Sequence, residues 1–269
     1  MSPLWRNHLR ILLGADRLVL TGYRRGLTPT QTREDCITLQ PRPGAAPWRA
    51  AMDVLTPALA PSRAERPDAT VVLSNHYVRY ALLPWNPALK THEEWMALAR
   101  HRLTAIHGEA VNDWLIRIAE TSPQGPRIVS AVDKALLDEL DDRFQGSGIA
   151  LSSVQPFLMT AFNRIQPMLG SEPCWFVIEE AGNLTVSLMR EGKWEAIRSR
   201  WVDERWSAAL PEILARKSAM LALDEPCNQA IVCTRHAFDP AMHRTLNTRA
   251  VNYDQLALSL NGGLQGTLQ

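Results

Sequence analysis

Two stretches of the chain, one near its start and one in its second half, repeat the same pattern of apolar and polar positions. Residues 9–23 and 174–189 each contain a short apolar run, a tight polar turn with a glycine, and a second run rich in leucine and β-branched residues. The two turns span residues 14–17 and 180–183. Apolar runs joined by a short glycine-containing turn predict a β-hairpin. The sequence therefore predicts two equivalent hairpins.

A third strand and a helix follow each predicted hairpin. The strands are expected at residues 36–39 and 194–201, and the helices at 48–59 and 204–223. A unit of three strands and a helix that is used twice implies two like domains facing each other across a cleft, because each sheet needs helices to cover it. This is the plan of the actin-like (ASKHA) superfamily, which includes sugar kinases. The predicted fold class is therefore α/β, with two ribonuclease H-like domains.

The residues between the two repeats predict an additional unit. From residue 76 to residue 133, strand-like and helix-like segments alternate as they would in a small α/β subdomain inserted into the first domain. Its helix is expected at residues 93–107, because apolar residues recur at helical spacing and two glutamates fall in the first turn. We expect domain I to span residues 1–170, with the subdomain at about 76–133, and an abbreviated domain II to span residues 171–269.

Composition narrows the classes of function. The chain has 269 residues, 46% of them apolar, which is enough for one large core or two modest ones. Its formal net charge is +1, so no global field attracts polyanions, and we expect no nucleic-acid partner. The four cysteines form no C-x-x-C pair and lie in or beside apolar runs, which favours buried thiols in a reduced, cytoplasmic protein. No window reaches the roughly 18 uninterrupted apolar residues of a membrane span.

Three segments resemble a known family. They are Val71–Trp85, with a Pro-Trp after a predicted strand, Ser153–Asn163, with a Pro-Phe before a predicted helix, and the hairpin Phe176–Trp194. These segments resemble the actin-like proteins of bacterial inner-membrane platforms, namely PilM of type IV pili, its MSHA-pilus counterpart, and the cytoplasmic domain of GspL in type II secretion. The resemblance implies an adaptor, peripheral to the inner membrane on its cytoplasmic side. It would bind the cytoplasmic tail of a single-span membrane partner and link that partner to an assembly ATPase.

The two predicted turns bear on ATP binding. Nucleotide-active members of the superfamily place an Asp at the end of the first strand of each domain to hold Mg²⁺. Small residues follow in the turn, so that backbone N–H groups reach the phosphates. Here the first strand ends in Leu13, Asp16 comes a turn too late, and bulky Arg17 occupies the expected phosphate cradle. Glu179 could replace the second acid, but a carboxylate without its partner is typical of a solvated turn residue.

We therefore expect a catalytically silent protein with no required cofactor. Its vestigial cleft would be formed by Gly14, Asp16, Glu179 and Gly182. The alternatives are an active ATP-binding ASKHA enzyme, such as a small kinase or ATPase, and an α/β protein of unrelated function. Gly262-Gly263 could imitate the glycine pair of an adenosine site. We expect no metal site, because Cys233, His236 and His243 lack a fourth ligand nearby.

Aromatic and cationic positions on two predicted strands are candidates for partner binding. Arg198 and Trp201 lie on the third strand of domain II, where they could offer an aromatic and cationic rim to a peptide. Tyr77 and Arg79 share one face of a strand in the inserted subdomain. One face of that strand must belong to a core, and the other is free to take a partner strand or tail.

Overall fold

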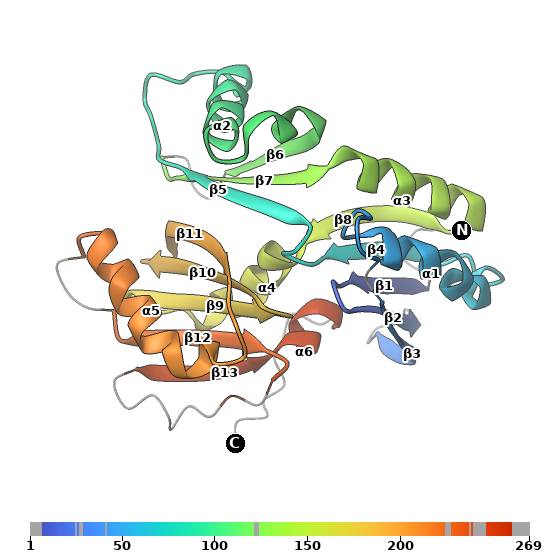
Figure 1. Cartoon of the computed structure of the whole chain (residues 1–269). Helices are drawn as coiled ribbons and strands as arrows, with labels where there is room; N and C mark the ends of the chain where they lie inside the picture. Colours follow the sequence, from blue (N-terminus) through green and yellow to red (C-terminus); the bar gives the residue numbers. More distant parts are fainter. Residues whose placement is uncertain are drawn as a thin grey trace.

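The described residues form three β-sheets and the helices that cover them. The computed structural model describes residues 7–24, 26, 29–40, 42–120, 124–223, 227–236, 238 and 246–259. Two of its sheets have five strands and the third has three (Figure 1). None of the described helices is long and apolar enough to cross a membrane.

The first sheet has the strand order β3-β2-β1-β4-β8. The first three strands form an antiparallel meander, whereas β4 pairs in parallel with β1, and β8 pairs in parallel with β4. The strands are β1 (His8–Leu13), β2 (Arg17–Arg24), β3 (Thr30–Thr38), β4 (Asp68–Leu73) and β8 (Ala150–Pro156).

The second sheet repeats this topology in the order β11-β10-β9-β12-β13. Its first three strands are again an antiparallel meander, and its last two are parallel additions. The two sheets match strand for strand, which confirms the predicted repeat. The second unit is shorter because, within the described residues, it has no counterpart of the third sheet. Its strands are β9 (Cys174–Glu180), β10 (Asn183–Arg190), β11 (Lys193–Trp201), β12 (Gln229–Thr234) and β13 (Asn247–Asn252).

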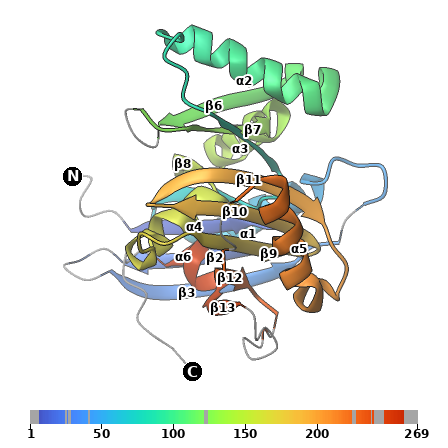
Figure 2. The same ribbon diagram turned by 90° about the vertical axis from the view of Figure 1, so that its left-hand side faces the viewer.

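The third sheet lies within the segment predicted as an inserted subdomain. Its order is β5-β7-β6, and helix α2 covers one face of it. In Figure 2, β6, β7 and α2 lie at the top of the view, on one side of the two larger sheets. Thr91 starts α2 with a capping box, in which its hydroxyl accepts from the Glu94 N–H and the Glu94 carboxylate accepts from the Thr91 N–H. The elements are β5 (Val78–Leu83), β6 (Trp114–Glu120), β7 (Arg127–Asp133) and α2 (His92–His107).

The remaining helices cover the two larger sheets and fill the space between them. Helices α1 and α3 pack on the first sheet, α5 packs on the second, and α4 and α6 share a core with strands of both sheets. This shared core holds Leu12 of β1, Ile178 of β9 and Leu256 of α6. The helices are α1 (Arg49–Leu59), α3 (Lys134–Ser147), α4 (Phe157–Ile165), α5 (Trp206–Met220) and α6 (Tyr253–Leu258), with short 3-10 turns at Ala60–Ser62, Gly108–Asp113 and Gln166–Met168.

Edge strands account for most of the differences from the sequence-based expectations. Strand β3 begins at Thr30 rather than near Cys36, and Cys36 is exposed rather than buried. Strand β13 was not predicted at all. Both strands lie at the outer edge of a sheet, so much of their surface meets water and their sequences lack an apolar run.

The prediction of a free face on β5 was wrong, because both faces of this strand are packed. Ala81 and Leu83 belong to the core beneath α2. Val78 and Tyr80 pack on the core of the first sheet. A partner therefore has no complete face of β5 to dock on.

The shared core predicts a large effect of truncating α6. Leu256 is fully buried, so Leu256→Ala should lower the free energy of unfolding by about 2–5 kcal/mol in urea titrations. Met220→Ala is the matched control, since this side chain is 77% exposed and its loss should change stability by less than about 0.5 kcal/mol. Equal effects of the two substitutions would contradict the packing of α6 between the sheets.

Candidate functional site

A backbone hydrogen bond within the first hairpin closes its turn. The Gly14 N–H donates to the carbonyl of Arg17 at 2.9 Å. A Cβ at Gly14 would lie 2.7 Å from that same oxygen, so this turn requires glycine for its own geometry. Leu13, at the position expected for a metal-binding acid, is fully buried. The turn therefore offers neither that carboxylate nor a free Gly14 N–H to a nucleotide.

The turn of the second hairpin is closed by a buried acid. Gly182 has a φ of +84° and donates its N–H to the Glu179 carboxylate at 3.1 Å. Glu179 is only 2% exposed, so the expectation of a solvated turn residue was wrong. Its carboxylate also accepts from the Thr234 hydroxyl at 2.8 Å and lies 2.8 Å from Nδ1 of His236. These neighbours compensate the burial of its charge.

The next residue, Glu180, joins the two halves of the molecule. Its carboxylate accepts from the Asn75 N–H at 3.0 Å and from the Tyr253 hydroxyl of α6. Its carbonyl oxygen lies 2.6 Å from Nε2 of His76. Burial raises the pKa of the Glu180 carboxyl, and its hydrogen-bond donors offset this only in part. The end of β4 is thereby tied to β9 and to α6.

An ion-pair network crosses between the two units beside Glu180. Arg235, just after β12, lies 3.1 Å from Asp16 in the first turn and 3.1 Å from Asp254 in α6. Its guanidinium also stacks 4.2 Å from the ring centroid of Tyr253. Burial raises the pKa of the Asp16 carboxyl, but the guanidinium groups of Arg235 and Arg17 outweigh this effect, so the pKa lies below its ordinary value. Protein side chains thus bridge the space between the two turns.

A hollow of about 960 Å³ remains on the second unit, beside its turn. Glu179, Gly182, Glu204, Trp206 and His236 are among the residues that line it. Within the described part of the chain, no cluster of three metal-ligating side chains is present. Gly262, Gly263 and His243 lie outside the described residues.

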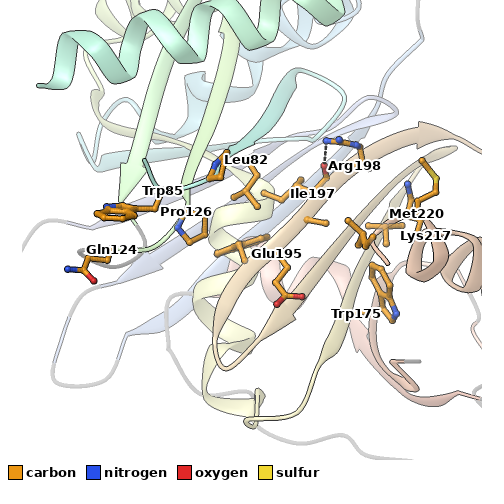
Figure 3. A pocket seen from close by; sticks show the side chains of 15 residues that line it. Leu82, Trp85, Gln124, Pro126, Trp175, Glu195, Ile197, Arg198, Lys217 and Met220 are labelled. Atoms are coloured by element: carbon orange, nitrogen blue, oxygen red, sulfur yellow. Dashed lines mark hydrogen bonds between the residues drawn. The ribbon is translucent and has the colours of Figure 1, made fainter. Parts of the chain in front are cut away.

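A second concave region runs along the edge strand β11, where the inserted subdomain contacts the second sheet. It consists of two adjoining hollows of about 490 and 510 Å³, both lined by Ile197 and Arg198. We call them together the β11 groove. One hollow continues to Trp85 at the end of β5 and to the last turn of α5 (Figure 3). The other continues to Arg79, to Trp201 and to the end of α2.

The β11 groove gathers exposed apolar side chains. The described residues include six large apolar side chains that are exposed. Five of the six line this groove, and soluble proteins rarely collect exposed apolar surface in one place without a binding role. The five are Trp85, Ile106, Trp201, Met220 and Leu221.

Comparison with solved structures decides the fold. A structure described as the PilM–PilN type IV pilus biogenesis complex matches with a TM-score of 0.66 and 14% identity, over 96% of this chain and 91% of that chain. A Bacteroides thetaiotaomicron protein with an actin-like ATPase fold matches with a TM-score of 0.63 and 9% identity, over 96% and 94% of the two chains.

The protein has the actin-like fold. The cytoplasmic domain of EpsL, an inner-membrane component of the Vibrio cholerae type II secretion system, also matches, with a TM-score of 0.58 and 13% identity over 93% and 92% of the two chains. The predicted fold class and the resemblance to pilus and secretion platform proteins are thus confirmed at the level of structure. No family model and no curated protein sequence matches the chain.

The actin-like fold places most of the predicted site residues in two groups. Gly14, Asp16, Glu179 and Gly182 lie at the two facing turns. Arg79, Arg198 and Trp201 line one hollow of the β11 groove. Tyr77 does not join them, because it is buried and donates its hydroxyl to the Gly14 carbonyl at 2.7 Å.

Sequence reasoning missed the residues that close the actin-like cleft. Arg235, Tyr253 and Asn75 lie far apart in the sequence and belong to no motif. The one available signal was the pair Glu179-Glu180 at the end of an apolar run. Two adjacent acids on a strand point to opposite faces, so both are buried when the strand is covered on both sides, as β9 is.

The buried carboxyl of Glu180 predicts a pH-dependent difference in stability. Its pKa is raised on folding, so the folded state retains a proton that the unfolded state loses above about pH 4.5. The free energy of unfolding then falls as pH rises through this window. Glu180→Gln removes this dependence, so the stability of the variant relative to the wild type should rise with pH in thermal melts.

Glu204→Gln provides the control for this experiment, because Glu204 is exposed in the loop before α5. Its stability relative to the wild type should change little with pH. If the stabilities of Glu180→Gln and the wild type changed equally with pH, the pKa of the Glu180 carboxyl would not be raised. Its burial between the two units would then be wrong.

Proposed function

We propose that the protein is a catalytically silent actin-like adaptor of a bacterial pilus or secretion platform at the inner membrane. It is cytoplasmic and peripheral, and it binds the cytoplasmic tail of a single-span membrane partner in the β11 groove. The observation that carries this proposal is the gathering of five exposed apolar side chains along one edge strand. The printed description of a PilM–PilN complex among the similar structures supports the class of partner.

Catalytic silence is supported by the state of the two turns. Gly14 and Gly182 use their N–H groups within the protein, at 2.9 Å and 3.1 Å from their acceptors. Leu13 replaces the first metal-binding acid, and Asp16 is engaged by Arg235 at 3.1 Å. A nucleotide phosphate would have to displace these contacts before it could bind between the turns.

The alternative function is an active ATP-binding enzyme of the ASKHA type. The hollow of about 960 Å³ beside the second turn favours it, because Glu179 and His236 line a space large enough for a small ligand. The lining as a whole argues against phosphate binding, since it holds three acids, Glu179, Asp203 and Glu204, and one arginine, Arg205. An assembly ATPase remains a second protein partner in this proposal, by analogy with the resembled family.

The silent cleft predicts no response to ATP. Millimolar ATP with Mg²⁺ should leave the melting temperature and the tryptophan fluorescence of the purified protein unchanged. If the protein bound ATP, an ATP concentration of a hundred times the Kd would add about 2.7 kcal/mol to the free energy of unfolding, and a thermal melt would detect this increase easily. A clear ATP-dependent stabilisation would overturn catalytic silence and favour the enzyme.

If the partner binds in the β11 groove, substitutions of groove residues should weaken its binding. Trp201→Ser should weaken binding of the platform partner's cytoplasmic tail by about 2 kcal/mol, or roughly thirtyfold in Kd, because the ring is 71% exposed in the groove and available to a ligand. Leu115→Ser is the control, since Leu115 is the one exposed large apolar residue among the described residues that lies outside the groove. Isothermal titration calorimetry measures both. Equal loss in the two variants would exclude the groove as the docking site.

A further inference from the structure

The outer edge of β11 has no paired strand among the described residues. β11 is the terminal strand of its sheet, and no ladder joins it to β5, although the two strands are in contact. Among the described residues, the backbone hydrogen bonds of Trp194 to Arg198 go to the neighbouring strand β10. The Ile197 carbonyl also accepts a hydrogen bond from the Arg198 guanidinium at 3.1 Å. Such an edge is a template for an added strand.

The hollow beside this edge has apolar walls on two sides. Leu82, Trp85 and Pro126 form the wall from the inserted subdomain, and Met220 lies on the opposite wall, at the end of α5 (Figure 3). Leu221 also lines this hollow. Side chains of an extended segment point alternately to either side of its backbone. A segment lying along β11 would therefore place apolar side chains against both walls.

Positive charge gathers along the same strand. Arg198 and Arg200 of β11 lie near Lys217 of α5, and none of the three has a carboxylate within 4 Å in the described part of the chain. The pKa of Lys217 is lowered by burial and further by the two guanidinium groups. Glu195 is the one acid among the described residues that line the groove, and it pairs with Arg190 at 2.9 Å.

We propose that the β11 groove takes an extended acidic peptide segment, which pairs with β11, buries apolar side chains against the two walls, and places carboxylates beside Arg198, Arg200 and Lys217. This inference rests on the proposed function and adds to it the chemistry of the tail. Carboxylates from the ligand would compensate three cations that have no acid within 4 Å among the described residues. The peptide would also bridge the inserted subdomain and the second sheet.

An anionic membrane surface would also attract the cations and exposed apolar side chains of the groove. The concave shape of the groove nevertheless favours a peptide over a membrane. The floor of the groove includes Trp175 and Trp194, which are 0% and 2% exposed. A flat bilayer reaches the rim of such a groove and not its floor, whereas a single extended chain fits between the walls. Charge and shape together therefore favour a peptide.

The test uses synthetic fluorescent peptides and the full chain. In one set, leucine or valine alternates with aspartate or glutamate, and in the other set asparagine and glutamine replace the acids. We expect fluorescence anisotropy to show acidic peptides binding about tenfold more tightly than their amide counterparts, with a preference that weakens at high salt. The triple variant Arg198→Gln, Arg200→Gln, Lys217→Gln should lose this preference.

A second triple variant controls for net charge. Arg24, Arg63 and Lys134 are exposed cations on other parts of the surface, and their replacement by glutamine removes the same charge. This control should keep the preference for acidic peptides. Loss of the preference in both variants would show a general charge effect and would overturn the proposal.

The outcomes distinguish a wrong prediction of acidic preference from a wrong prediction that the groove binds a tail. If acidic and amide peptides bind equally and Trp201→Ser weakens both, the groove binds a tail but the acidic preference is wrong. If no peptide binds, the proposed docking function fails as well. If vesicles rich in phosphatidylglycerol bind the wild type and the charge control but not the groove variant, while peptides do not bind, the face is a membrane contact and the proposal is overturned.

Discussion

The buried carboxylate of Glu180 is the contact on which the arrangement of the two halves depends. It accepts the Asn75 N–H after β4 and the Tyr253 hydroxyl of α6, so one side chain joins both repeated units to the helix between them. A buried carboxyl group that loses its hydrogen-bond donors destabilises a protein, because its polar atoms are then neither solvated nor paired. Movement of one unit against the other would break these bonds. The contact therefore favours one fixed relation between the two units.

This closure determines where a ligand can bind. Actin-like folds have two facing turns, and here the space between them is crossed by Arg235 and Asp16. The β11 groove, by contrast, holds exposed tryptophans and several cations, and Glu195, the one acid among its described lining residues, is paired with Arg190. His76 lies between the two regions, since it contacts the Glu180 carbonyl at 2.6 Å and the Trp201 ring at a centroid distance of 5.1 Å. An occupant of the groove would thus adjoin the contacts that close the cleft.

The repeated hairpin and the inserted subdomain could be predicted because apolar periodicity and glycine turns are local signals. Arg79, Arg198 and Trp201 were proposed as aromatic and cationic positions on strands, and the structure places all three around one hollow. The edge strand β13 escaped prediction because exposed strands carry no apolar pattern. Arg235 and Tyr253 escaped because their partners lie on other elements, and only the assembled fold brings them to Asp16 and Glu180. Tyr77 was assigned to a surface because its sequence pattern does not reveal that β5 is packed on both faces.

Hydrogen–deuterium exchange on the full chain tests the central claim most directly, because it locates binding without any substitution. The protein is compared alone, with Mg²⁺-ATP, and with the tail of the proposed platform partner. The account predicts slower exchange in β11 and β5 with the tail and no change at residues 14–17 and 180–183 with ATP. Protection of the two turns by ATP, together with unchanged exchange in β11 with the tail, would contradict it.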